Sequence, residues 1–172
     1  MSKMSSRVVV SPLEAKRKKV ERWLVEEGWS MVPAELAVPL KMAWVIAAEM
    51  QKTTIYAFQQ PNRPDQLFIQ GSVGLNNSQR AVFFGLSSEQ RKAIIWDLRL
   101  DLLKLGVDFS GVSEVLEVVH VRQAVFNDGL TKDRFMQRVG AVSRAQLFVA
   151  WTFARHCAEA PAPEPEEGFF IN

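Results

Sequence analysis

The spacing of apolar residues changes repeatedly along this chain, between the period of a helix and the period of a strand. Three segments place apolar side chains three or four residues apart, and the segments between them alternate apolar with polar residues. Successive strands joined by short turns form an antiparallel sheet, and helices bury their apolar faces against such a sheet. The order helix, strands, helix, strands, helix therefore predicts an α+β fold, with the helices packed mainly on one face of the sheet.

The first helical segment has clear signals at both ends. Ser11 and Glu14 have the spacing of a capping box, and Pro12 stands at the first helical position. Gly28 suits the left-handed residue that follows a helix. We expect a helix between these limits, preceded by a flexible arm over residues 1–10.

The region from Trp29 to about Gly85 has the pattern of three or four strands. Alternation predicts strands over Leu40–Met50, Thr53–Gln60 and Gln66–Val73. A turn over Gly74–Ser78 would allow Arg80–Phe84 to pair back as a fourth strand.

A second helix is predicted from Ser87 or Ser88 to Leu105, ended by Gly106. One of its faces carries Ile94, Ile95, Leu98, Leu102 and Leu105, and the opposite side carries Trp96, Leu100 and Leu103. One apolar stripe is enough to cover a sheet. The second stripe therefore needs another partner, either more of this chain or a second subunit.

The last third of the chain is expected to hold one or two strands and a long helix. The β-branched run Leu116–Phe126 indicates a strand, and Thr131 is the expected N-cap of the helix. The core stripe of that helix is Phe135, Val139, Val142, Val149, Phe153 and Cys157. Leu147, Phe148 and Trp151 add a second apolar sector, which is again more than one sheet face requires.

The final fourteen residues, 159–172, differ from the rest in composition. They contain four glutamates, no Lys or Arg, and Ala-Pro and Glu-Pro repeats. We expect a disordered, acidic, proline-rich tail after a single α+β domain over residues 11–158. The alternative is that Phe169, Phe170 and Ile171 dock on a partner or on the chain's own body.

Residues that could perform catalysis or bind a metal are few. The chain has two histidines and one cysteine, without the ligand spacing of a zinc site. Cys157 falls on the core stripe, which predicts a buried, inert thiol. We predict no catalytic, cofactor or metal site. An enzyme or small-molecule binder would need a pocket with convergent polar groups, such as His120 with Arg122 or Asp128.

Nucleic-acid binding and membrane association are disfavoured. Without the tail the chain has 21 basic and 15 acidic residues, a mild excess of +6. Aromatic residues on the predicted strands superficially resemble a base-stacking platform, but the usual RNA-binding signatures are missing. Those residues are Tyr56, Phe58, Phe68 and Phe83. There is no signal peptide and no apolar run of membrane-spanning length, so a soluble cytoplasmic protein is expected.

Two short segments resemble a known group of proteins. They are Val20–Trp29 (VERWLVEEGW) and Val125–Met136 (VFNDGLTKDRFM), with the capped helix of Leu86–Leu105 between them. Over about Leu13–Ala158 the chain resembles a prokaryotic family of unknown function, related to YbjN-type proteins and class I type III secretion chaperones. The resemblance implies an α+β sandwich that forms a homodimer and binds protein without catalysing a reaction.

Three functional hypotheses follow. The first is a non-enzymatic protein-binding or regulatory module that acts as a homodimer, possesses no cofactor and has an unidentified protein partner. Its dimer or partner surface is predicted to contain Trp96, Leu100, Leu103, Leu147, Phe148 and Trp151. The second is a small-molecule binder or enzyme with a pocket between sheet and helices. The third is weak nucleic-acid binding.

Overall fold

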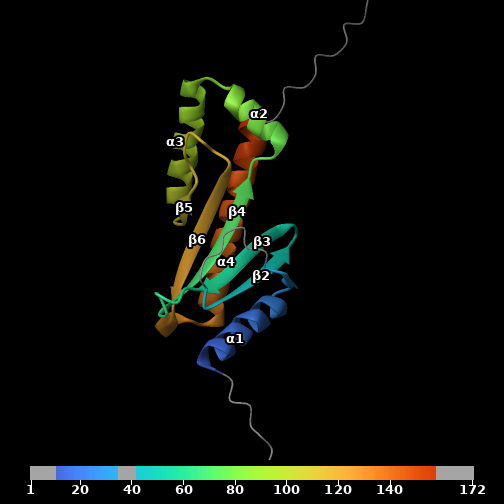
Figure 1. Cartoon of the computed structure of the whole chain (residues 1–172), viewed down its shortest axis with the longest axis vertical. Helices are drawn as coiled ribbons and strands as arrows, with labels where there is room; N and C mark the ends of the chain where they lie inside the picture. Colours follow the sequence, from blue (N-terminus) through green and yellow to red (C-terminus); the bar gives the residue numbers. More distant parts are fainter. Residues whose placement is uncertain (1–10, 35–41, 158–172) are drawn as a thin grey trace, which may run out of the picture.

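A computed structural model describes residues 11–34 and 42–157, and these residues form an α+β structure (Figure 1). The predicted N-terminal arm, the tail and the first residues of the predicted strand Leu40–Met50 lie outside this part. The helices and strands, in chain order, are α1 (Pro12–Glu26), β1 (Ser30–Val32), β2 (Trp44–Met50), β3 (Thr53–Gln59), β4 (Gln66–Gly74), α2 (Asn77–Gly85), α3 (Ser88–Lys104), β5 (Asp108–Ser110), β6 (Val118–Phe126), the 3-10 turn η1 (Asn127–Gly129) and α4 (Lys132–His156).

The described strands form one sheet of order β1-β2-β3-β4-β6-β5, in which all neighbours are antiparallel. The central pair β4 and β6 is in register over nine residues, from Gln66 opposite Phe126 to Gly74 opposite Val118. The antiparallel sheet expected from the sequence is confirmed.

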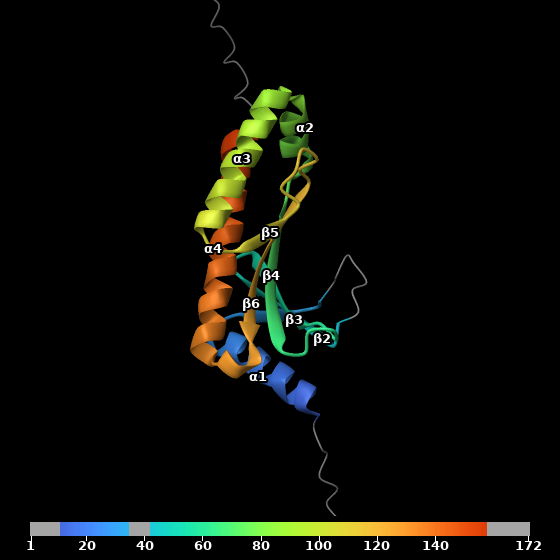
Figure 2. The ribbon, with the colours of Figure 1, turned by 90° about the vertical axis from the view of Figure 1, so that its left-hand side faces the viewer.

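The helices lie mainly on one face of the sheet (Figure 2). α4 runs along this face, with α3 beside its C-terminal half and α1 near its N-terminal end. Buried side chains of α4, such as Phe135 and Val149, belong to the same core cluster as buried strand residues such as Leu67 and Val121. The inward-facing side chains of the strands and the apolar stripe of α4 thus form one core, as expected for this layer arrangement.

The predicted helix limits are confirmed because the capping contacts form. The Glu14 backbone N–H donates to Ser11 Oγ at 3.2 Å, and the Arg134 N–H donates to Thr131 Oγ1 at 3.3 Å. Ser87 and Gln90 form a reciprocal capping box at the start of α3. Gly28 has φ +85°, the left-handed conformation that ends α1.

The predicted fourth strand over Arg80–Phe84 is wrong, because these residues belong to helix α2. Asn76 and Gln79 form a capping box in which Asn76 Oδ1 accepts from the Gln79 N–H at 2.8 Å. A short apolar run fits both a strand and a helix, and here the cap selects the helix. Phe83, on the inner side of α2, is fully buried. The fourth strand of this region is instead β1, directly after α1.

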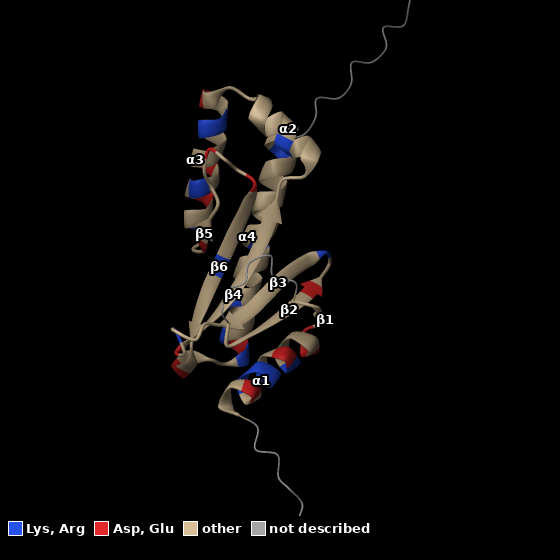
Figure 3. Ribbon diagram, in the orientation of Figure 1, with Lys and Arg blue, Asp and Glu red and all other residues tan. Residues whose placement is uncertain are grey.

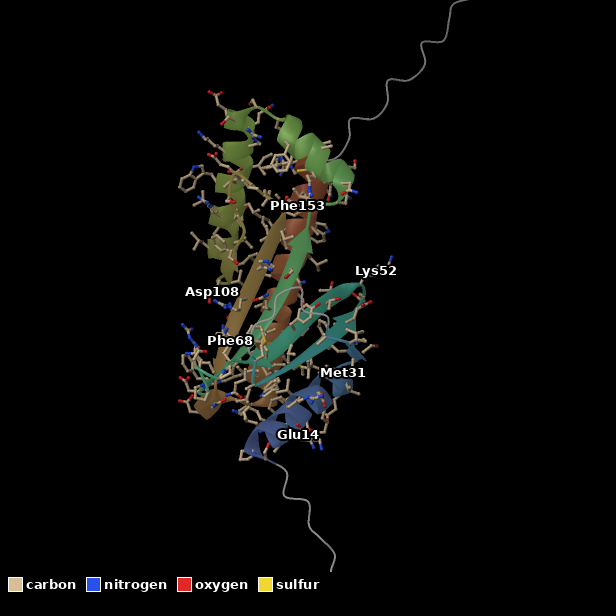
Figure 4. All side chains as sticks on the ribbon, in the orientation of Figure 1. Glu14, Met31, Lys52, Phe68, Asp108 and Phe153 are labelled. Atoms are coloured by element: carbon tan, nitrogen blue, oxygen red, sulfur yellow. The ribbon has the colours of Figure 1, made fainter. Side chains whose placement is uncertain are left out.

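The sheet divides between β3 and β4 on the side of the β2–β3 turn. Their pairing covers four positions and ends where Ile55 faces Gly71. Beyond that point the β2–β3 hairpin turns away from β4 (Figure 1). The hairpin closes at Gln51 (φ 50°) and Lys52 (φ 66°), both in the left-handed region that a two-residue turn requires. Lys52 lies at the tip of this hairpin (Figure 4).

Candidate functional site: two apolar surfaces

The outer side of α3 exposes three large apolar side chains. Trp96 is 60% exposed, Leu100 48% and Leu103 63%. The inner stripe predicted for this helix is buried at Ile94, Ile95, Leu98 and Leu102, whereas Leu105 follows the last helical residue and is exposed. A helix that is apolar on both sides normally buries both. The outer side of α3 is therefore an unpartnered apolar surface in the described chain.

Arg99 holds this helix against the loop that precedes β6. Its Nε and Nη2 donate to the Val112 carbonyl oxygen at 3.0 and 2.7 Å, and its guanidinium lies 5.8 Å from the centre of the Trp96 ring. A groove of about 310 Å³ is lined by Trp96, Arg99 and Glu114, together with Lys92, Ile95 and Ser113. The exposed indole is thus held in place by packing on one side.

A second apolar surface lies on α4. Leu147 and Trp151, one helical turn apart, are 43% and 68% exposed. Phe148 is half-buried and packs against the core. Leu147 borders a cleft whose other walls are the β2–β3 hairpin and the end of β4. The six predicted interface residues therefore fall into an α3 surface (Trp96, Leu100, Leu103) and an α4 surface (Leu147, Trp151), with Phe148 largely inside.

The cleft beside Leu147 contains a buried polar group that sequence reasoning missed. Gln146 is only 5% exposed, and its Nε2 donates to the carbonyl oxygens of Thr54 at 3.0 Å and Ser72 at 3.5 Å. Its amide thus bridges β3 and β4 where their pairing ends. The amide oxygen of Gln146 has no hydrogen-bond partner among the described residues.

The cleft has a volume of about 420 Å³. Its lining residues come from the hairpin, from β4 and from α4, and are Gln51, Lys52, Thr53, Thr54, Ser72, Val73, Gly74, Gln146, Leu147 and Ala150. Two sequence features could have indicated this cleft. One is the polar residue Gln146 on the core side of α4, between Ala145 and Val149, and the other is a glycine, Gly71, inside a predicted strand.

The polar residues proposed for a pocket are brought together only in part. His120 and Arg122 line a small pocket of about 80 Å³ with Asp108 of β5, and Asp128 lies in a separate pocket beside α4. His120 Nδ1 is 2.7 Å from Ser72 Oγ. This hydrogen bond joins β4 to β6 on the face of the sheet opposite α4.

Of the four aromatic residues predicted on strands, Phe58, Phe68 and Phe83 are buried and Tyr56 of β3 is half-buried. Phe83 lies on helix α2 and not on a strand. Phe58 and Phe68 stack with ring centres 5.5 Å apart, and both are buried. The guanidinium groups of Arg63 and Arg122 lie 5.9 and 5.2 Å from the centre of the Phe68 ring. Buried rings cannot stack on nucleic-acid bases, so Phe58 and Phe68 act in packing.

The basic residues of α1 are mostly paired with acids. Arg17 lies 3.1 Å from Glu21, and Lys18 lies 3.8 Å from Glu14. Both signs of charge alternate along this helix (Figure 3). Lys16 differs, since its Nζ donates to Asn127 Oδ1 at 3.0 Å and partial burial lowers its pKa. α1 therefore presents a mixed charge pattern and no continuous basic stripe.

Metal ligands do not gather in the part of the chain that the structure describes: no group of three or more His, Cys, Asp or Glu could hold an ion there. Cys157 is buried at the end of α4, and burial raises the pKa of its thiol. Within residues 11–34 and 42–157, no helix is long and apolar enough to cross a membrane.

Fold and surfaces together define a class: an α+β protein with helices on one face of an antiparallel sheet and two exposed apolar surfaces on those helices. The chain belongs to the family described as "Uncharacterized conserved protein (DUF2299)", whose model matches residues 16–153. No match was found among the curated proteins. The expected membership of an uncharacterised family is therefore confirmed.

Several solved structures are similar to the chain, and they include the following three. One is an uncharacterised protein from Methanothermobacter thermautotrophicus, with 28% identity, a TM-score of 0.71 and coverage of 83% of this chain and 99% of that one. The others are YbjN from E. coli (13% identity, TM-score 0.47, covering 84% and 95%) and the ExsC–ExsE complex (14%, 0.49, covering 83% and 97%). YbjN and the ExsC–ExsE complex correspond to the groups that the sequence resembles, YbjN-type proteins and class I type III secretion chaperones.

Proposed function

We propose that this chain is a non-enzymatic protein-binding or regulatory module that acts in the cytoplasm as a homodimer. The observation that carries the proposal is the α3 surface, where Trp96, Leu100 and Leu103 are all exposed on one helix. The likenesses to YbjN and to the ExsC–ExsE complex are too distant to add to this argument. The proposal therefore rests on the surface of this chain.

Burial of these side chains would supply the free energy of association. Removing a large apolar side chain from water contributes about 1.5–3 kcal/mol. Tryptophan is also prominent among the residues that dominate interface energies. Trp96 suits such a role because it is 60% exposed and the Arg99 guanidinium lies beside one side of its ring.

A second copy of the chain is the occupant that the charges of α3 favour. Asp97 and Lys104 are seven residues apart, as are Trp96 and Leu103. Two copies of α3 packed antiparallel across a two-fold axis near Leu100 would place Trp96 of one copy against Leu103 of the other. The same axis brings Lys104, whose Nζ lies 2.8 Å from Asp101 of its own helix, close to Asp97 of the other copy. A self-complementary surface of this kind suits a two-fold dimer.

The test replaces Leu100 and Leu103 together with aspartate. We expect wild-type protein to be a dimer by light scattering coupled to size exclusion, and the variant to be a monomer, because two buried carboxylates oppose association. Far-UV circular dichroism and the unfolding midpoint should stay close to wild type, since both leucines are exposed in the described chain.

The matched control is the double variant Leu147→Asp with Trp151→Asp, which changes the α4 surface in the same way. It should remain a dimer. A monomeric wild-type protein would contradict the homodimer. A Leu100→Asp, Leu103→Asp variant that remains a dimer would show that the interface lies elsewhere, and one that fails to fold would assign these leucines to the core.

A further inference from the structure

The cleft between β3 and β4 has the features of a docking site for an extended segment of polypeptide. On the side facing β3, the Ser72–Gly74 end of β4 has no strand partner among the described residues, because the pairing of the two strands ends at Gly71. On its other side the same end of β4 pairs with Val118–His120 of β6. An edge without a strand partner is a template for another strand, and on this side the Ser72 carbonyl oxygen accepts only a 3.5 Å hydrogen bond from Gln146 Nε2.

Gln146 supplies a second observation at this place. Its side chain is buried and lines the cleft, and its amide oxygen has no partner in the described structure. The orientation of the amide is set by Nε2, which donates to two carbonyl oxygens. A buried acceptor without a donor costs about 1–3 kcal/mol. A segment that brings backbone N–H groups into the cleft would recover part of that free energy.

The α4 face beside the cleft combines apolar and basic side chains. Arg144, Leu147, Trp151 and Arg155 recur at three- and four-residue intervals and are all exposed. Neither Arg144 nor Arg155 makes an ion pair with a described residue. A segment that fits this face therefore has large apolar side chains and negative charge.

The chain's own tail has this composition. Residues 159–172 carry four glutamates and no basic residue, and they contain Phe169, Phe170 and Ile171. No proline follows Pro165, so residues 166–171 keep every backbone N–H needed for strand pairing.

The length of the tail also suits the cleft. α4 rises about 1.5 Å per residue, which puts Leu147 roughly 15 Å from Cys157 at the helix end. An extended chain covers about 3.3 Å per residue, so the twelve residues from Cys157 to Phe169 reach up to about 40 Å. The excess length allows the chain to reverse direction after α4 and return along it.

We propose that residues 166–171 dock on α4 of the same chain, with Phe169 and Ile171, which share one side of an extended strand, on Leu147 and Trp151 and with the Glu166–Glu167 end toward Arg155. The docked segment adds a short strand beside Ser72–Gly74 and covers the cleft above Gln146. This inference uses a different surface from the α3 dimer and does not depend on it.

The first measurement compares hydrogen exchange of the full-length chain with that of a Phe169→Glu, Phe170→Glu variant. We expect amides within Ser72–Gly74 to exchange about tenfold faster or more in the variant, because the added strand is lost. A synthetic peptide with the sequence of residues 159–172, added to that variant, should restore slow exchange. Unchanged exchange at Ser72–Gly74 would overturn the proposal.

The second measurement changes the other side of the contact. Chymotrypsin cleaves after phenylalanine, so docking protects Phe169 and Phe170. We expect Leu147→Glu with Trp151→Glu to raise the cleavage rate at these positions about tenfold, and equal rates would contradict docking on α4. The matched control, Leu100→Asp with Leu103→Asp, should leave protection unchanged. Loss of protection in this control would assign the docking to the other subunit of a dimer and overturn docking within the chain.

Discussion

At the scale of single residues, the contact between Gln146 and Gly71 determines how closely α4 packs on β4. The Gln146 amide lies directly over the α-carbon of Gly71, so that a β-carbon at position 71 would overlap it. Only glycine leaves room for the amide to reach the Thr54 carbonyl oxygen. A polar group can thus occupy a core position of α4 because one strand residue has no side chain.

This contact predicts that Gly71→Ala lowers the free energy of unfolding by about 1–3 kcal/mol, the usual penalty for overpacking a core. Urea denaturation measures the change. Gln146→Ala in the same chain removes the overlapping amide, so the double variant should lose less than the sum of the single variants. Gly85→Ala is the control, because a β-carbon there meets nothing within 4 Å. Additive losses would disprove the steric explanation.

Cys157 gives a second prediction at this scale. Burial raises the pKa of its thiol, so the folded chain holds the proton to higher pH than the unfolded chain does. This contribution to stability is complete below the pKa of the unfolded thiol and is lost as pH rises through the raised value. At pH 8 we expect a thiol reagent such as DTNB to react about a hundredfold more slowly with folded than with urea-unfolded protein, because only the exposed thiolate attacks. Comparable rates would show that Cys157 is accessible.

At the scale of elements, α2 shows how a capping contact decides between two structures. The run Arg80–Phe84 fits a strand as well as a helix, but Asn76 and Gln79 exchange hydrogen bonds at the start of α2. The helix turns Phe83 into the core beside α4, where its ring contacts Phe84 at 5.5 Å between centres.

We therefore expect Asn76→Ala to lower the free energy of unfolding by about 1 kcal/mol, the typical value of an N-cap. Equilibrium denaturation in urea would measure this loss. Asn76→Ser keeps a side-chain acceptor and should retain most of the stability. If both substitutions have the same effect, the capping contact does not stabilise α2.

At the scale of the whole molecule, the two apolar surfaces lie on different helices with different surroundings. The α3 surface borders the loop before β6, and the α4 surface borders the β2–β3 hairpin. Substitutions on one surface therefore leave the side chains of the other surface unaltered. The acidic double variants of the two surfaces separate the homodimer from tail docking, because each proposal predicts a change from the variant on its own surface and none from the variant on the other.

Much of this architecture was predictable from local patterns. The limits of α1, α3 and α4 follow from caps such as Ser11 and Thr131, which act over three residues. The excess of apolar residues on α3 was also readable, because helical geometry places Trp96 and Leu100 on one side whatever the rest of the fold does.

The candidate sites were predictable only in part. The sequence indicated that Leu147, Phe148 and Trp151 exceed what one sheet face needs, but Phe148 turned inward while the other two stayed exposed. Helical spacing puts Gln146 on the core side of α4, but it predicts neither the cleft nor the two carbonyl oxygens that Gln146 contacts, because both depend on how far β3 and β4 remain paired.

The sequence was enough to place the long helices α1, α3 and α4, most of the strands and the apolar stripes, since these depend on interactions between residues close together in the chain. It did not place α2 or β1. Tertiary structure decided where the sheet divides, which aromatic rings are buried and which of the extra apolar residues on α4 stay exposed. Those features depend on contacts between segments such as Thr54, Ser72 and Gln146, which are distant in the chain. Spacing along the sequence carries no information about such distances, and packing alone sets them.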